Sequence, residues 1–408
     1  MRILLLTETV PYPLDSGGRI KTFNTLRMLS GEHEVHCFAF IRDEGQRSHL
    51  APLRQACASV TLELLPRSPA RELHYALQSL LTGRPYTVIR HFHPGSLASI
   101  ERVAGKGFDA VYADHLSMFE YARRLGLPVI HDAHNVESEV LRRYGRTRRF
   151  SPIRPLLARE WRLVRRYERA AYRESALVCA VSEQDARAIR ALAGREGGVR
   201  VVPIAIDALG VTPRQTVEPE PRLLFVGGLH WPPNRDAVLH FVREVWPRVR
   251  TVVPSAQLTV VGREDALVAR ILRQAPGVTV TGYVDDVGPF FAASRAMVVP
   301  LRAGSGMRVK ILDAFALGLP VVSTPVGHEG IEVRPGVHLL SAAGARRFAE
   351  ETVRVLTDDR LAAVLAAEAR RLAVDRYDVR VVRKLLLDAV GRVRSPGQGA
   401  DEVRPGTT

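Results

Sequence analysis

The stretch MRILLLTETVPYPLDSGGRIKTFNTLRMLS, residues 1–30, determines the fold expected for this chain. Residues 1–9 are an apolar run typical of a buried strand, and apolar residues recur with helical spacing between residues 20 and 30. The loop between them contains Gly17 and Gly18, which allow a close backbone approach to a ligand. A strand, a glycine-containing loop and a helix form half of a doubly wound α/β unit.

The same alternation continues over the first half of the chain. Short apolar runs are separated by segments with helical patterns, which predicts one Rossmann-like domain over residues 1–205. The further strands are expected at residues 35–41, 60–65, 110–113, 129–131 and 177–180.

A second series of strands follows the turn-rich residues 205–221. Short apolar strands that end at glycine and alternate with helices, such as the helix expected at 237–249, are typical of a parallel sheet. We therefore expect a second Rossmann-like domain at residues 206–378, with a ligand in the cleft between the two domains. Its strands are expected at residues 222–228, 256–262, 278–282, 296–301 and 319–324.

The end of the chain and its composition complete this outline. We expect a last helix at residues 379–394, packed back on the N-terminal domain, and a disordered tail at 395–408. The three cysteines are too far apart for a disulfide framework or a metal-ligand spacing, which predicts reduced thiols and a cytoplasmic protein. Neither a signal-peptide core nor an apolar run of about 18 residues is present in the sequence.

A formal net charge of +15 favours anionic partners, and much of it lies in residues 142–173. Arginines alternate there with leucine, tryptophan and tyrosine, a pattern that fits a basic helix on an anionic membrane surface or a plain solvated helix face. Nucleic acid is not expected as a partner, because the charge is not accompanied by an aromatic platform or a recognition motif.

Several motifs together resemble the family 4 nucleotide-sugar glycosyltransferases, most closely the branch found with bacterial exopolysaccharide and PEP-CTERM gene systems. The resemblance implies the GT-B architecture, two Rossmann-like domains that face each other across a cleft. The motifs are SGGR (16–19), DAHNVES (132–138), VSEQDA (181–186), FVGGLHWPPNRDAVLHF (225–241), VVGR (260–263), VTGYVDDVGPFFAASRAMVVPL (280–301) and GSGMRVKILDAFALGLPVVSTPVGHEGI (304–331).

The resemblance implies a donor site in the C-terminal half. Asp313 matches the carboxylate that holds the donor ribose, where glutamate is usual, and Ser305 replaces a second acid of the family. The family's usual diphosphate-binding Arg and Lys are absent after residue 228, so Arg308 and Lys310 are expected to neutralise the leaving diphosphate. The alternatives are that Asp313 pairs with Lys310 and that Arg308 points to solvent. The other donor-binding residues expected are Gly17, Gly18, Gly228, Asn234, Arg263, Tyr283, Val284, Gly304, Gly306 and Met307.

The resemblance also implies a reacting histidine in the N-terminal half. His134 matches the family histidine near the transferred sugar, and His131 is the less suitable candidate because it lies within an apolar run.

In the C-terminal half, Asp285 and Asp286 are adjacent to each other and are expected to contact the nucleobase rather than a metal. No metal or other cofactor is expected, since the nucleotide-diphosphate sugar is a co-substrate.

The implied reaction is sugar transfer to a hydroxyl with retention of anomeric configuration, by front-face attack. The acceptor would be a sugar or a lipid-linked acceptor in cell-surface polysaccharide assembly, at the inner face of the cytoplasmic membrane. Two alternatives stay open: a nucleotide-sugar 2-epimerase of the same architecture, and a non-catalytic subunit that binds a nucleotide sugar.

Overall fold

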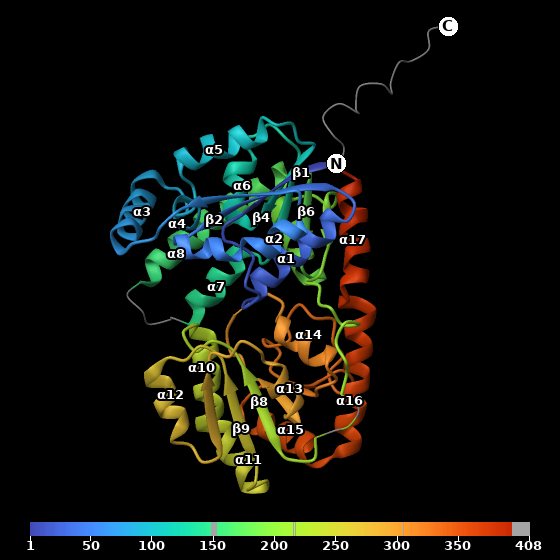
Figure 1. Ribbon diagram of the computed structural model, residues 1–408. Coiled ribbons are helices and arrows are strands. Elements are labelled where there is room, and N and C mark those ends of the chain that lie inside the picture. Colours follow the sequence, from blue (N-terminus) through green and yellow to red (C-terminus); the bar gives the residue numbers. More distant parts are fainter. Residues whose placement is uncertain (148–152, 215, 217, 305, 394–408) are drawn as a thin grey trace. The chain divides into compact units, whose positions relative to one another are not determined.

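The computed structural model describes residues 1–147, 153–214, 216, 218–304 and 306–393, with only the backbone of residues 146 and 147 (Figure 1). The contacts between residues divide the chain into two compact units. The first unit is Met1–Ile204 together with the residues from Val382 on, and the second unit is Ala205–Val381. Each unit is one parallel sheet with helices on its faces, so the expected α/β class is confirmed. Ser305 and the tail at 395–408 lie outside the described residues.

The first unit contains a seven-stranded sheet in which all neighbouring strands are parallel. Its order is β3 (Ser59–Leu64), β2 (Glu34–Ile41), β1 (Arg2–Thr7), β4 (Ala110–Asp114), β5 (Val129–Ala133), β6 (Leu177–Ala180), β7 (Val199–Val201). The helices are α1 (Gly17–Ser30), α2 (Leu50–Ala56), α3 (Pro69–Thr82), α4 (Tyr86–Ile89), α5 (Pro94–Ala104), α6 (Leu116–Ala122), α7 (Glu137–Thr147), α8 (Arg154–Glu174) and α9 (Glu183–Ala193), with a 3₁₀ turn at Glu44–His49.

The second unit repeats this topology with six parallel strands. Its order is β10 (Val278–Gly282), β9 (Gln257–Val261), β8 (Arg222–Val226), β11 (Ala296–Val299), β12 (Val321–Ser323), β13 (Leu340–Ser341). The helices are α10 (Pro232–His240), α11 (Trp246–Val252), α12 (Ala266–Arg273), α13 (Gly288–Ala292), α14 (Val309–Ala316), α15 (Ala345–Thr357) and α16 (Asp359–Leu372), with π-helical turns at Phe241–Val245 and Ala373–Tyr377.

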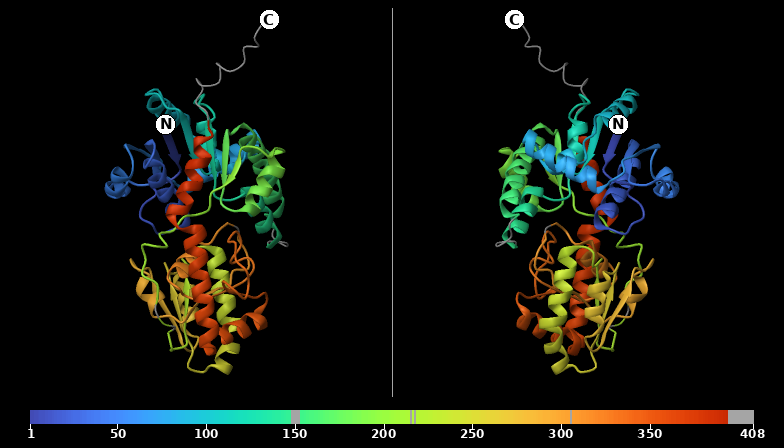
Figure 2. Two further views of the ribbon diagram at one scale, coloured as in Figure 1. Left: turned by 90° about the vertical axis from the view of Figure 1, so that its right-hand side faces the viewer. Right: turned by 90° about the vertical axis from the view of Figure 1, so that its left-hand side faces the viewer.

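The central strands are buried on both faces, as their continuous apolar runs predict. Residues 3–6 of β1 are fully buried between helices that cover the two faces of the first sheet (Figures 1 and 2). The helix α17 (Val379–Gly391) enters the first unit at Val382, and its Arg383 guanidinium donates a 2.9 Å hydrogen bond to Glu32. Among the described residues, no helix is both long and apolar enough to cross a membrane.

Two details differ from the expectations. The helix α1 begins at Gly17, so Gly17 and Gly18 form its first turn instead of a loop. The apolar residues that predicted this helix lie between residues 20 and 30, so they gave no signal for its first turn. The edge strands β7 and β13 were not expected, because they have only three and two residues and show no periodicity.

Cys37 lies in β2, Cys179 lies in β6, and Cys57 directly follows α2. Cys37 and Cys179 are buried and Cys57 is partly buried, and none forms a disulfide. Burial raises the pKa of all three thiols, that of Cys57 to about 11.

Candidate active site

Both sheets have a switch point where the chain winds to opposite sides, between β1 and β4 in the first unit and between β8 and β11 in the second. Doubly wound sheets bind ligands beyond the carboxyl ends of the strands at this point. Polar residues gather at this place in each of the two units.

In the first unit, the buried carboxylate of Asp114 ends β4 and organises the group. It accepts hydrogen bonds from the hydroxyls of Thr7 (2.7 Å) and Thr22 (2.9 Å), and from the rings of His115 (3.1 Å) and His134 (2.8 Å). Burial alone would raise the pKa of Asp114, but the two histidines lower it well below its usual value. Asp114 is therefore an anion that ties β1, α1, β4 and β5 together.

His115 is the next residue, and its backbone is strained. With φ 74° and ψ 159° it is the one non-glycine residue with positive φ in the described part of the chain, in a region that is essentially reserved for glycine. Burial would lower the pKa of its imidazole, but the Asp114 carboxylate raises it to about 10. The ring is therefore a cation at neutral pH, and it lies against the first turn of α1, since a Cβ at Gly18 would be 3.9 Å from its Nε2.

His134, the expected reacting residue, is stacked on this cation. The two ring centroids are 3.7 Å apart, and His134 Nε2 donates to Asp114. Burial, followed by the charges of His115 and Lys21, lowers the pKa of His134, so its ring is held neutral. Lys21 forms a buried ion pair with Asp132, which also accepts a 2.8 Å hydrogen bond from Tyr112. The arrangement gives His134 one fixed orientation.

His131 has a different environment, in agreement with its lower ranking in the sequence. It is fully buried in the sheet, with its ring edge-on to Phe119 and Tyr172. Burial lowers its pKa to about 4. It is a core residue.

Asp114, His115 and His134 also offer ligand atoms within 4.8 Å of one another, a spacing that a metal ion can use. Both rings already donate to the carboxylate, and a histidine must lose its proton to bind a metal. In the structure these three groups are joined to one another by hydrogen bonds.

In the second unit, glycines line the carboxyl edge of the sheet. Gly227 donates its N–H to Val261 (2.8 Å), and Gly262 donates to Gly282 (3.0 Å). A Cβ at Gly262, where φ is 142°, would lie 2.6 Å from the carbonyl of Gly227. Larger residues cannot replace this glycine without displacing the backbone.

Lys310 reaches this edge from α14. Its Nζ donates to the carbonyl of Val226 at the end of β8 and approaches Asn234 Oδ1 at 3.4 Å, and the Asn234 amide donates to Gly228 O at 3.2 Å. Burial and the neighbouring Arg308 lower the pKa of Lys310 to about 7. The structure thus brings Lys310, Asn234 and Gly228, all predicted donor-site residues, to one place.

Arg308 lies one residue before α14 and is 8% exposed, so the solvent-pointing alternative is wrong. Its guanidinium lies 5.9 Å from the centre of the Trp231 ring. A Cβ at Gly304, where φ is 129°, would be 2.5 Å from Arg308 Nη2, so the absence of a side chain there makes room for the guanidinium.

Asp313 lies in the middle of α14 and is half-buried. Burial raises its pKa to about 7. The alternative pairing with Lys310 is not observed, because the Lys310 ammonium is directed to Val226 and Asn234. Within the described residues, no side chain is hydrogen-bonded to the Asp313 carboxylate, which leaves its oxygens available to a ligand.

The remaining predicted donor-site residues surround the same edge less closely. Arg263 is exposed and Tyr283 is 54% exposed, while Val284 is half-buried and Met307 is buried. Gly306 has a φ of 81° in the loop before α14. Asp286 accepts the N–H of Gly288 at 2.8 Å and so closes the turn before α13, whereas the Asp285 side chain is exposed.

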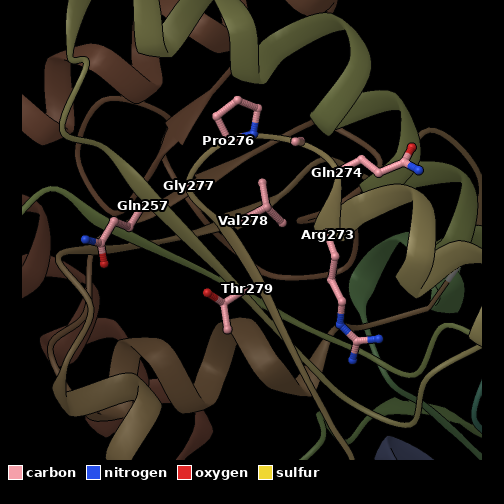
Figure 3. A pocket seen from close by; sticks show the side chains of 8 residues that line it. Gln257, Arg273, Gln274, Pro276, Gly277, Val278 and Thr279 are labelled. Atoms are coloured by element: carbon pink, nitrogen blue, oxygen red, sulfur yellow. The ribbon is translucent and has the colours of Figure 1, made fainter.

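A pocket of about 470 Å³ lies at the opposite edge of the second sheet, where β9 and β10 begin (Figure 3). Its one charged lining residue, Arg273, already donates to Glu264 at 2.8 Å and to Val280 O at 3.2 Å. The pocket contains no predicted site residue and lies at the wrong end of the strands for a doubly wound fold.

Sequence reasoning missed four charged residues of the first group: Lys21, Asp114, His115 and Asp132. One signal was present, since the pairs Asp114–His115 and Asp132–His134 follow adjacent apolar strands. Their convergence required the strand order, which periodicity alone does not supply.

Two family models match the chain: Glycosyltransferase Family 4 over residues 22–208, and Glycosyl transferases group 1 over residues 220–358. A Klebsiella pneumoniae protein described as an uncharacterized 44.6 kDa protein in the cps region is 27% identical over 139 residues. This match covers 32% of the present chain and 36% of the relative, so it spans about a third of the relative's length.

Solved structures establish the fold. HepE of Anabaena, crystallised with UDP and glucose, is 16% identical with a TM-score of 0.67, over 96% of this chain and 99% of that chain. Sucrose-phosphate synthase of Thermosynechococcus elongatus is 17% identical with a TM-score of 0.73, over 96% and 98%. TarM of S. aureus is 10% identical with a TM-score of 0.69, over 95% and 98%.

Proposed function

Because the chain belongs to the family 4 glycosyltransferases with the GT-B fold, we propose that it transfers a sugar from a nucleotide-diphosphate donor to a hydroxyl acceptor with retention of configuration. The observation that carries the proposal is the group at the end of β8. Two basic side chains, Arg308 and Lys310, lie there beside glycines that permit a close backbone approach. Preorganised positive charge of this kind stabilises a departing diphosphate.

The proposed chemistry needs little beyond positioning and charge. The bond between the anomeric carbon and the diphosphate oxygen breaks, and the acceptor oxygen bonds to the same face of that carbon. The acceptor proton passes to the departing phosphate. Arg308 and Lys310 hold the diphosphate, Asp313 accepts hydrogen bonds from the ribose hydroxyls, and His134 contacts the sugar.

The donor class is supported by a structural neighbour. HepE of Anabaena was crystallised with UDP and with UDP-glucose. A nucleotide-diphosphate sugar of this class suits a site that combines a carboxylate with two cations. No metal is part of the proposed reaction.

The acceptor is proposed to be lipid-linked or membrane-proximal, in bacterial surface polysaccharide assembly at the inner face of the cytoplasmic membrane. The Klebsiella relative from the cps region supports the pathway. The exposed arginines of α8 support attraction to anionic lipid. Arg148 and Arg149 of the basic segment lie outside the described residues.

Thermal-shift measurements with UDP, GDP, TDP and ADP test the proposal, followed by release of the diphosphate from the matching nucleotide sugar. A nucleotide at about 100 times its Kd stabilises the folded state by roughly 2.7 kcal/mol. We expect one nucleotide to raise Tm in the wild type and not in Arg308→Ala/Lys310→Ala. Arg302→Ala is the matched control, because this exposed arginine is paired with Asp236. If no nucleotide raises Tm and no donor is cleaved, the proposal fails.

A further inference from the structure

The helix α3 exposes its apolar side. Of its residues only Ser79 is buried. Leu73, Leu77, Leu80 and Leu81 recur with helical spacing and are 63%, 51%, 51% and 87% exposed. An amphipathic helix normally turns such a stripe toward its own core. Figure 1 shows α3 at the outer edge of the first unit.

Polar contacts hold the other side of α3 to the unit. Ser79 Oγ donates to Arg84 O at 2.7 Å, and Arg159 Nη2 of α8 donates to Ser79 O at 2.6 Å. Glu72 accepts a hydrogen bond from the Tyr86 hydroxyl and another from Arg90. Outward leucines are therefore a consequence of how the helix is anchored.

The start of α8 extends the same surface. The contact between Arg159, in the second turn of α8, and Ser79 places the beginning of α8 near the end of α3. In the turn before Arg159, Ile153 and Leu156 are 42% and 55% exposed. We call Leu73, Leu77, Leu80, Leu81, Ile153 and Leu156 the leucine face.

The rest of α8 bears on the two alternatives that the sequence left open for the basic segment, a membrane-surface helix or a solvated helix face. Of its apolar residues, Val164 is buried and Trp161 and Leu163 are partly buried. Its exposed side is formed by arginines: Arg162, Arg165, Arg166, Arg169 and Arg173. Beyond its first turn, the exposed side of α8 therefore supplies mainly charge to a membrane.

The charges around the leucine face are basic. Arg67, Arg71 and Arg154 are exposed at the starts of α3 and α8. The acids nearest to this surface are engaged within the unit: Glu72 bonds to Tyr86 and Arg90, and Glu160 accepts the backbone N–H groups of Tyr86 (3.2 Å) and Thr87 (3.3 Å). Apolar side chains bordered by arginines match a bilayer that contains anionic lipid.

We propose that the leucine face of α3 inserts into the surface of an anionic membrane, with the neighbouring arginines against the headgroups. The helix would lie in the plane of the interface with its leucines among the acyl chains. This inference rests on the membrane-proximal acceptor of the proposed function. It assigns most of the apolar part of the contact to α3, a helix outside the basic segment, with Ile153 and Leu156 at the start of α8 as the remainder.

Cosedimentation with phosphatidylcholine vesicles, with and without phosphatidylglycerol, tests the proposal. The wild type should bind the anionic vesicles, and Leu77→Gln/Leu81→Gln should bind about tenfold more weakly or not at all, because the apolar area is lost. Glutamine is a good helix former, so α3 should persist. Leu267→Gln is the matched control, since Leu267 of α12 is 61% exposed on the other unit and should change nothing.

Three outcomes would overturn the inference: no vesicle binding by the wild type, equal binding by the double variant, or equal loss in the Leu267 control. If instead the wild type self-associates in solution without binding vesicles, and the double variant does not, the face is a contact between copies. Thermal shift by the nucleotide is measured on the same samples. It reports on the proposed function independently, since it does not require a membrane.

Discussion

The strained backbone of His115 can be measured by comparing His115→Gly with His115→Ala. Both variants remove the imidazole and its contacts with Asp114 and His134, so their difference isolates the backbone. A non-glycine residue in this region costs about 1–3 kcal/mol. Glycine in turn lowers the free energy of unfolding by about 0.5–1 kcal/mol, because the unfolded chain has more conformational freedom at a glycine. From the middles of these two ranges, the glycine variant should be more stable than the alanine variant by about 1 kcal/mol.

Urea denaturation of both variants at one pH, monitored by circular dichroism, gives this difference from the midpoints and slopes. An alanine variant that is as stable as the glycine variant, or more stable, would refute the strained conformation.

The wild type should also differ from both variants in its pH dependence. The folded pKa of about 10 lies above the ordinary 6.5, so the His115 contribution is complete below pH 6.5 and is lost as the pH rises through 10. The stability of the wild type should fall over this range more steeply than that of either variant.

Three further predictions concern the second unit. Arg308→Ala/Lys310→Ala should lower turnover and nucleotide-diphosphate affinity at least about tenfold, because two basic groups at the diphosphate are lost. The circular dichroism spectrum should be unchanged. Wild-type kinetics in this variant would contradict the assignment. Asp313 and Lys310 both titrate near pH 7, so nucleotide affinity, measured by calorimetry, should be highest near pH 7. Asp313→Asn should weaken binding about tenfold and remove the decline on the acid side; an unchanged acid limb would exclude Asp313 from ribose binding. Gly262→Ala should lower the free energy of unfolding by roughly 2 kcal/mol or more, because its Cβ would lie 2.6 Å from Gly227. An unshifted urea midpoint would show that the edge can relax.

The strands were the most predictable part of the molecule. Runs such as RLLFV at 222–226 and LVCA at 177–180 are apolar without alternation, because helices cover both faces of the sheet. The edge strand β13 escaped prediction because two residues carry no periodic signal. The division of the first half of the chain into a sheet with helices followed from local patterns alone.

Residues of the candidate site could be predicted only where they lie in a motif that resembles the family. His134 and Lys310 could be identified by their place in a motif, but their partners could not. Thr7 and Asp114 are 107 positions apart, and they meet only because β1 and β4 are neighbours in the sheet. Likewise, the reach of Lys310 to the carbonyl of Val226 depends on where α14 lies relative to the end of β8. Contacts of this kind depend on three-dimensional packing, which no local pattern encodes.

The burial of the native thiols has a consequence for site-specific labelling. With a pKa of about 11, Cys57 is a thiolate in about one molecule in ten thousand at pH 7. A cysteine introduced at an exposed position such as Leu81, with an ordinary pKa near 8.5, would be a thiolate about 300 times more often. Because thiolates are the reactive form, a maleimide dye or nitroxide should attach to the new site without removal of the natural cysteines. The chain as it stands is therefore a ready background for fluorescence and electron paramagnetic resonance measurements.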